Sequence, residues 1–302
     1  MASERLQQIS RTVIKKLEAT ATAEGVGATV RRSIGGGGLN RLDPFLMLDH
    51  FHLRPGSGFP DHPHRGQATV TYMLEGSVQH EDSVGNAGTI GAGDLQWMIA
   101  GKGIIHAEMP VHGPGLPDPV GLQLWVDLPR QHKMSPPSYQ ELTKVNIPNA
   151  FPDGPEGSSE IVVISGKSHG VESPVRHLVG CWYLDIKLKT KGATVFQDLP
   201  AGWTAFFYTL SGSLSINGKA YEPFYTLVLS SDEQQNGVSI TATTDNTRAV
   251  LIAGEPLNQP VVQMGPFVMN TKEGIQKTLL DYRMGKNGFE KSMTWKSAIG
   301  GR

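Results

Sequence analysis

The sequence predicts an all-β protein made of two similar domains in tandem. Its 302 residues include 36 glycines and 20 prolines, well above their average combined usage of roughly 12%. Short runs rich in β-branched and apolar residues recur between these turn residues, which is typical of strands joined by tight turns. A short repeat also relates the two halves of the chain. Together these observations favour many short strands over long helices.

Three segments of the first half carry clear strand signals. Residues 69–74 (TVTYML) and 94–99 (DLQWMI) are rich in apolar and β-branched side chains and are bounded by glycine turns. In residues 122–128 (LQLWVDL), polar and apolar residues alternate, which predicts a strand with two different faces. Residues 6–19 fit either a short helix or an alternating strand, and both alternatives stay open.

The repeat relates residues 72–77 (YMLEGS) to residues 208–213 (YTLSGS), 136 positions later. Both copies follow an apolar strand and precede another one, so two similar β domains are the economical interpretation. A segment rich in Asn, Pro, Gly and Ser lies between the halves. We therefore predict a first domain at 1–145, a linker at 146–160 and a second domain at 161–302.

The end of the chain has a helical pattern. Residues 270–273 (NTKE) resemble a capping box,. Ile275, Leu279 and Tyr282 then recur at a spacing that places them on one helical face, and Gly285 supplies a stop. We assign this predicted helix to the second domain.

Composition and charge exclude several classes of protein. The formal net charge is −1 and the pI about 6.8, so no basic field favours direct binding to nucleic acid. Cys181 is the only cysteine, which excludes an intrachain disulfide and a zinc site built from cysteines. No apolar run approaches the roughly 18 residues of a membrane span, and no secretory signal is recognisable. We expect an intracellular monomer.

Two short pairs of residues predict a metal site. His62 and His64 are two positions apart, and so are His106 and Glu108. On a strand, residues i and i+2 point to the same face, so each pair aims two ligands at one spot. A surface loop is the alternative for the first pair, and a solvent-facing strand end is the alternative for the second.

The predicted ligands restrict the metal without identifying it. Nitrogen and oxygen donors without thiolate suit iron, manganese, nickel, copper or zinc. Four protein ligands would leave octahedral iron or manganese two open positions, and a one-electron change at iron would alter the local charge by one unit. At the repeat offset His62 and His64 become Asp198 and Pro200, and proline has no ligating side chain. We therefore expect one ion per chain, in the first domain.

Four segments carry a resemblance to a known family. Residues 59–66 (FPDHPHRG), 93–98 (GDLQWM) and 101–110 (GKGIIHAEMP) resemble the pirins of the cupin superfamily, and residues 265–271 (GPFVMNT) resemble their C-terminal signature. The resemblance implies two tandem cupin β-barrels of the jelly-roll type, with a metal site in the first alone. It also implies one non-haem iron, Fe²⁺ or Fe³⁺, although other first-row metals stay open.

The resemblance assigns the iron to the same four residues that the spacing picks out: His62, His64, His106 and Glu108. One position departs from the family pattern. Many cupins and pirins carry a glutamate four residues after the second histidine, and here that residue is Ala68. Glu108 would then be the sole carboxylate near the metal.

Two functions from different classes follow from the resemblance. The first is a redox-sensitive transcription co-regulator that acts through contacts with a transcription-factor complex, in the nucleus or the cytoplasm. The alternative is a quercetin 2,3-dioxygenase, in which a flavonol binds the metal and Glu108 is the catalytic base. In that enzyme Arg65 and Gln96 would contact the polar groups of the flavonol, and Phe59 and Trp97 would form an apolar wall. An ordinary packing role is the alternative for these four.

Overall fold

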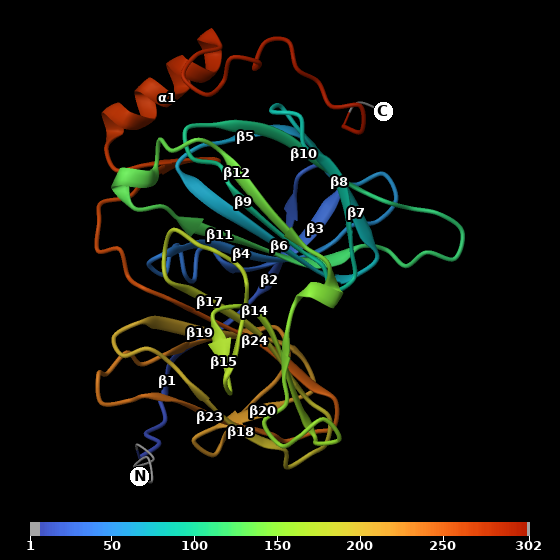
Figure 1. The fold of residues 1–302 in the computed structure, drawn as a ribbon, viewed down its shortest axis with the longest axis vertical. Helices are drawn as coiled ribbons and strands as arrows, with labels where there is room; N and C mark the ends of the chain where they lie inside the picture. The colour runs from blue at the N-terminus through green and yellow to red at the C-terminus, as the bar shows by residue number, and fades with distance from the viewer. Residues whose placement is uncertain (1–6, 301–302) are drawn as a thin grey trace. The chain divides into compact units, whose positions relative to one another are not determined.

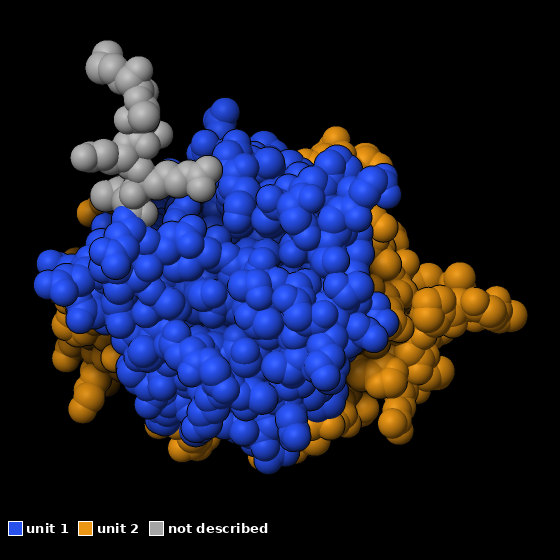
Figure 2. Space-filling view, turned by 90° about the horizontal axis from the view of Figure 1, so that it is seen from below, with its two compact units in different colours: residues 1–19, 147–256 blue, residues 20–146, 257–302 orange. Residues whose placement is uncertain are grey.

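The structure is a computed structural model in which residues 7–300 are described. The chain divides into two compact units, which are coloured separately in Figure 2: unit 1 contains residues 1–19 and 147–256, and unit 2 contains residues 20–146 and 257–302. Each unit has one seven-stranded and one four-stranded antiparallel sheet (Figure 1). The predicted all-β fold with a helix near the C-terminus is confirmed, although the strands form separate sheets rather than closed barrels.

Unit 2 contains most of the first half of the chain. Its seven-stranded sheet consists, in spatial order, of β12 (Ser138–Leu142), β9 (Leu95–Ile99), β6 (Gln67–Glu75), β11 (Val120–Asp127), β4 (Phe45–His52), β3 (Ala28–Ile34) and β2 (Thr20–Glu24). Its four-stranded sheet consists of β5 (Phe59–His64), β10 (Ile104–Pro110), β7 (Ser77–Asp82) and β8 (Ala87–Gly91). The remaining elements are the 3-10 helices η1 (Arg130–His132) and η2 (Lys144–Asn146), the hairpin of β25 (Val262–Met264) and β26 (Phe267–Met269), and helix α1 (Lys272–Met284).

Unit 1 repeats this topology. Its seven-stranded sheet has the order β1 (Val13–Glu18), β22 (Tyr225–Leu229), β19 (Thr204–Ser211), β24 (Thr247–Gly254), β17 (Cys181–Leu188), β14 (Ser159–Ser165) and β13 (Asn149–Ala150). Its four-stranded sheet has the order β18 (Thr194–Asp198), β23 (Gly237–Ala242), β20 (Leu214–Ile216) and β21 (Lys219–Tyr221), and β15 (Lys167–Ser168) pairs with β16 (Val171–Glu172). The two copies of the sequence repeat begin in β6 and β19, which are each the third strand of their sheet.

The ends of the chain do not follow the predicted domains. The N-terminal segment, whose first predicted residue lies outside the described part, forms strand β1 and pairs with β22 of unit 1. By their contacts, helix α1 and its flanking residues belong to unit 2 rather than to the unit that contains residues 161–256. The predicted linker is also partly ordered as β13, which pairs with β14. Local sequence cannot show which sheet edge a terminal segment will complete.

Helix α1 begins and ends where the sequence predicted, although Thr271 is its N-cap and Gly274, rather than Glu273, is the third helical residue of the expected capping box,. The Thr271 side chain accepts a hydrogen bond from the backbone N–H of Gly274, and Gly285 ends the helix in the left-handed region at φ 62°. The face carrying Ile275 packs in a small apolar cluster with Phe267 and Phe289. Among the described residues, α1 is the sole α-helix, and its 13 residues are too few to span a membrane.

Arg65, directly after β5, fastens this C-terminal segment within unit 2. Its guanidinium is 1% exposed and forms an ion pair of 2.8 Å with Asp281 of α1. It also donates hydrogen bonds to the backbone carbonyls of Lys102 and Asn287 and lies 4.6 Å from the ring centroid of Phe289. A buried guanidinium is tolerated because it is paired and its donors find acceptors.

We predict that Asp281→Ala destabilises the protein by about 3 kcal/mol, because it leaves the Arg65 charge buried without its counter-ion. The remaining carbonyl acceptors keep the effect at the lower end of the range for broken buried pairs. Urea unfolding of the full chain followed by circular dichroism measures the change. Gln276→Ala, at an exposed position of the same helix, is the control and should change the free energy of unfolding by less than about 0.5 kcal/mol. Equal effects of the two variants would contradict the anchoring role.

Candidate metal centre

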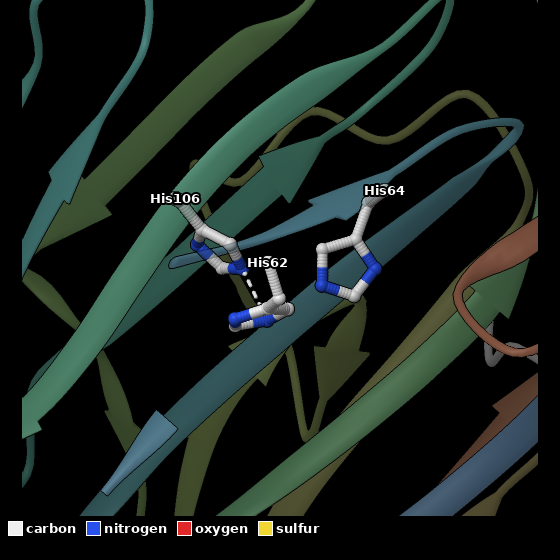
Figure 3. A group of neighbouring side chains, drawn as sticks. All are labelled: His62, His64 and His106. Carbon is white, nitrogen blue, oxygen red and sulfur yellow. Dashed lines mark hydrogen bonds between the residues drawn. The ribbon is translucent and has the colours of Figure 1, made fainter. Parts of the chain in front are cut away.

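Three histidines meet inside unit 2 because of the pairing between β5 and β10. The antiparallel register places His106 opposite His62, and the alternation of the strand places His64 on the same face as His62. One ligand nitrogen from each of the three rings lies within 4.8 Å of the other two, and Figure 3 shows the rings turned toward one another. The structure therefore brings together three of the four predicted ligands.

The imidazoles are held in orientations that suit a metal. His62 Nδ1 lies 2.9 Å from the carbonyl oxygen of Pro60, to which it can donate a hydrogen bond, and this leaves Nε2 free to accept,. The Gln67 amide lies 3.0 Å from His64 Nδ1. His64 Nε2 is buried without a hydrogen-bond partner in the described chain, and a ring nitrogen of His64 points toward His62 (Figure 3).

The spacing of the nitrogens also fits an ion. His62 Nε2 and His106 Nε2 are 2.9 Å apart. Two nitrogens bound at right angles to one metal at about 2.1 Å would be ~3 Å apart. A first-row metal would therefore take the place of the hydrogen that these two atoms share. The donor set and its geometry fit such a metal.

Burial keeps the two inner imidazoles neutral. His64 and His106 are almost fully buried, whereas His62 is partly exposed. Desolvation lowers the pKa of both inner rings well below the usual value, and the charge of protonated His62 lowers it further. Neutral imidazole is the form that binds metal, so neither inner ring has to lose a positive charge before it binds.

Glu108, the fourth predicted ligand, lies beside the three histidines but outside the group that they form. It follows His106 on the same face of β10, and its Oε2 is 3.9 Å from His106 Nε2. Thr71 Oγ1 donates to Oε1 at 3.1 Å and Gln123 Nε2 donates to Oε2 at 3.1 Å. Burial raises the pKa of Glu108, while the charge of protonated His62 and the bond from Thr71 oppose this.

The four predicted pocket residues differ in their contacts and in the direction of their side chains. Arg65 is engaged with α1, as described above, and so has a structural role. Trp97 pairs with Val70, whereas Gln96 pairs with Thr71, so alternation places Trp97 on the face away from Glu108. The predicted substrate contacts of Arg65 and Trp97 are therefore wrong. Gln96 donates to Glu141, and Phe59, partly buried, packs edge-on against Phe51; for these two, a role in substrate binding remains a prediction.

Sequence reasoning missed three residues beside the site: Thr71, Gln123 and Trp125. Trp125 is partly exposed, and its ring lies perpendicular to His64 with centroids 5.1 Å apart. The alternation of residues 122–128 already placed Gln123 and Trp125 on one face. It could not show that this face points toward the histidines.

The corresponding place in unit 1 has a different character. The fixed offset of 136 selects Asp198, which is exposed. The buried residues of that strand are Val195 and Gln197, and Gln197 pairs with Val238. Val238 belongs to a large apolar cluster that fills unit 1. The loops of the two units differ by one residue, so the fixed offset of 136 compared His62 with the wrong residue. The prediction of no second metal site is unaffected by this shift, because Gln197 and Val238 are not histidines either.

Two jelly-roll units, one of which holds three converging histidines, define a two-domain cupin of the metal-binding kind. The chain matches the Pirin family model over residues 27–126 and the model of the Pirin C-terminal cupin domain over residues 183–288. It is 49% identical to Pirin of Rattus norvegicus over 96% of this chain and 98% of the relative, and 47% identical to Pirin-like protein 2 of Arabidopsis thaliana over 96% and 89%. The chain belongs to the pirin family.

Solved structures agree with this family. A quercetin 2,3-dioxygenase from Acinetobacter baumannii superposes with a TM-score of 0.82 and 33% identity, over 93% of this chain and 99% of that one. The bacterial pirin YhhW from Escherichia coli, solved in complex with nickel(II), has a TM-score of 0.63 and 20% identity, over 80% of this chain and 99% of that one. At that identity the second likeness shows the shared fold alone.

The lowered pKa values of His64 and His106 predict how the stability of the metal-free protein depends on pH. The unfolded chain takes up protons as the pH falls below about 6.5 and the folded protein does not, so stability decreases by up to about 1.4 kcal/mol per pH unit for each histidine. Glu108 has a raised pKa and therefore opposes this decrease.

Urea unfolding in the presence of a chelator, at pH 7.5 and at pH 5.5, measures the effect. His106→Asn should lose about half of the decrease, because one of the two imidazoles is gone. His52→Asn, at an exposed position, is the control and should keep the wild-type dependence. If wild type and His106→Asn have the same dependence on pH, the inner histidines are not held neutral by the fold.

Proposed function

We propose that this pirin is an iron-dependent dioxygenase of the quercetin 2,3-dioxygenase type, with one ion per chain. The observation that carries the proposal is the site of three histidines, two buried and one partly exposed, in a chain that is 33% identical to a quercetin 2,3-dioxygenase along nearly its whole length. His62, His64 and His106 would hold the iron, with Glu108 as the fourth ligand. Bound iron would supply a Lewis acid for the flavonol oxygens and a redox centre for O2.

The side chains of this protein have distinct parts in such a reaction. Glu108 would accept the hydroxyl proton of the flavonol, because it is a buried carboxylate that lies beside the three histidines,. Trp125 presents a partly exposed aromatic surface beside His64, which suits a flat aromatic substrate,. His62, the partly exposed histidine, marks the side from which a substrate would approach.

We predict that the protein reconstituted with Fe²⁺ degrades quercetin under air, with loss of flavonol absorbance and release of carbon monoxide. His64→Ala and Glu108→Ala should each reduce kcat by at least 100-fold, because one removes a ligand and the other removes the base. His52→Ala is the control and should retain wild-type turnover. Metal analysis should find one ion per chain. No turnover with any first-row metal would rule out flavonol dioxygenase activity.

A second proposal is a redox-sensitive transcription co-regulator, present in the nucleus or the cytoplasm. The four-stranded sheet that carries the ligands also holds residues near the C-terminus. Asp61 of β5 accepts hydrogen bonds from the backbone N–H and the hydroxyl of Ser297, and Glu81 of β7 accepts one from the Ala298 N–H. A change in the charge of iron bound to His62 would therefore be transmitted through the neighbouring Asp61 to the segment around Ser297. A protein partner that binds this segment would distinguish the two oxidation states, and the protein itself would not contact DNA.

For the second proposal we predict that Fe²⁺ and Fe³⁺ forms differ in hydrogen exchange at residues 295–300. The same comparison with redox-inert Zn²⁺ under oxidising and reducing conditions is the control and should show no difference. Identical exchange in the two iron forms would mean that the metal charge does not reach this segment, and the proposed redox readout would fail.

A further inference from the structure

The carboxylate of Glu108 accepts hydrogen bonds from side chains of the opposite sheet of unit 2. Thr71 of β6 and Gln123 of β11 are paired in the sheet register, so their side chains stand next to each other. Thr71 Oγ1 lies 3.1 Å from Glu108 Oε1, and Gln123 Nε2 lies 3.1 Å from Glu108 Oε2. The Gln123 amide therefore donates to Oε2, and Oε1 accepts from the Thr71 hydroxyl.

The two donors also contact each other. Thr71 Oγ1 lies 2.7 Å from Gln123 Oε1, which fixes which end of the Gln123 amide faces Glu108. With its oxygen turned to Thr71, the amide presents its nitrogen to the carboxylate. Thr71, Gln123 and Glu108 thus form a closed ring of contacts, in which the single hydroxyl hydrogen of Thr71 is shared between Glu108 Oε1 and Gln123 Oε1,. Each side chain in this ring limits the rotamers of the other two.

This ring leaves room for a metal. Each carboxylate oxygen has two lone-pair sites, and the described contacts use one on each oxygen. The Oε2 atom lies 3.9 Å from His106 Nε2, so a free lone pair remains close to the three histidines. Thr71 and Gln123 therefore do not compete with a metal for Glu108.

We propose that Thr71 and Gln123 are positioning residues that hold the Glu108 carboxylate at the metal centre. They lie on the sheet that carries none of the predicted ligands, so the site is assembled from both sheets of unit 2. This inference rests on the proposed role of Glu108 as fourth ligand. Partners that orient a metal ligand in this way typically contribute 10–100-fold to metal affinity.

The test measures Co²⁺ affinity of the full-length, metal-free protein by competition with a chelating dye. Thr71→Val and Gln123→Leu should each weaken binding by 10–100-fold, whereas Thr71→Ser, which keeps the hydroxyl, should restore the affinity to within about threefold. Thr69→Val is the matched control: Thr69 is also buried, two positions away on β6, and takes no part in the ring. It should leave the affinity unchanged. Circular dichroism checks that each variant is folded.

A double-mutant cycle separates positioning of Glu108 from a general effect on folding. In a Glu108→Ala background, Thr71→Val should cause no further loss of affinity, because the group that it positions is gone. An equal loss with and without Glu108 would overturn the proposal, and so would unchanged affinity in the single variants. If Glu108→Ala itself binds Co²⁺ as tightly as wild type, the positioning role fails while the three-histidine site stands. If wild type binds no metal, both fail.

Discussion

The candidate site depends on the antiparallel pairing of β5 with β10. This register places His62 opposite His106, and the two-residue period of the strands brings His64 and Glu108 to the same face. A slip of one residue would turn the imidazoles toward the outside of the sheet. The pairing therefore has to be fixed more firmly than two short strands could fix it alone. Arg65 supplies part of that constraint, since it follows His64 directly and is tied to the buried side of α1.

The interiors of the two units show how a duplicated fold can be used differently. Unit 1 is filled by a continuous apolar cluster that includes Phe207, Leu227 and Leu251, so its interior contributes stability through burial of apolar area. Unit 2 gives up part of that contribution and buries His64, His106 and Glu108 instead. Buried polar groups are tolerated when they are paired, and the bonds to Glu108 from the opposite sheet meet this condition. The two inner imidazoles are instead left with nitrogens that a metal can bind.

Much of this could be predicted from the sequence, because it depends on local rules. Turn-rich composition, the period of two in 122–128 and the capping signal at Thr271 are local, and each predicted the element that forms. The i, i+2 spacing found the three histidines for the same reason. The unit that each terminal segment joins, the structural role of Arg65 and the outward face of Trp97 depend on contacts between residues far apart in the chain. The Arg65–Asp281 bond, for example, joins residues 216 positions apart.

Contacts between distant parts of the chain extend the metal-binding domain beyond residues 1–145. Residues 1–145 contain all four predicted ligands, yet the strand that carries His62 and His64 is held by residues near the other end of the chain. Arg65 would lose Asp281 and Phe289 if the C-terminal segment were absent, and its buried charge would then lack a counter-ion. Lys133, also buried, donates to Asp127 and to the carbonyl of Val268, so a second buried cation depends on the same segment. The geometry of the three histidines therefore depends on residues 257–302 as well as on the strands that the first half supplies.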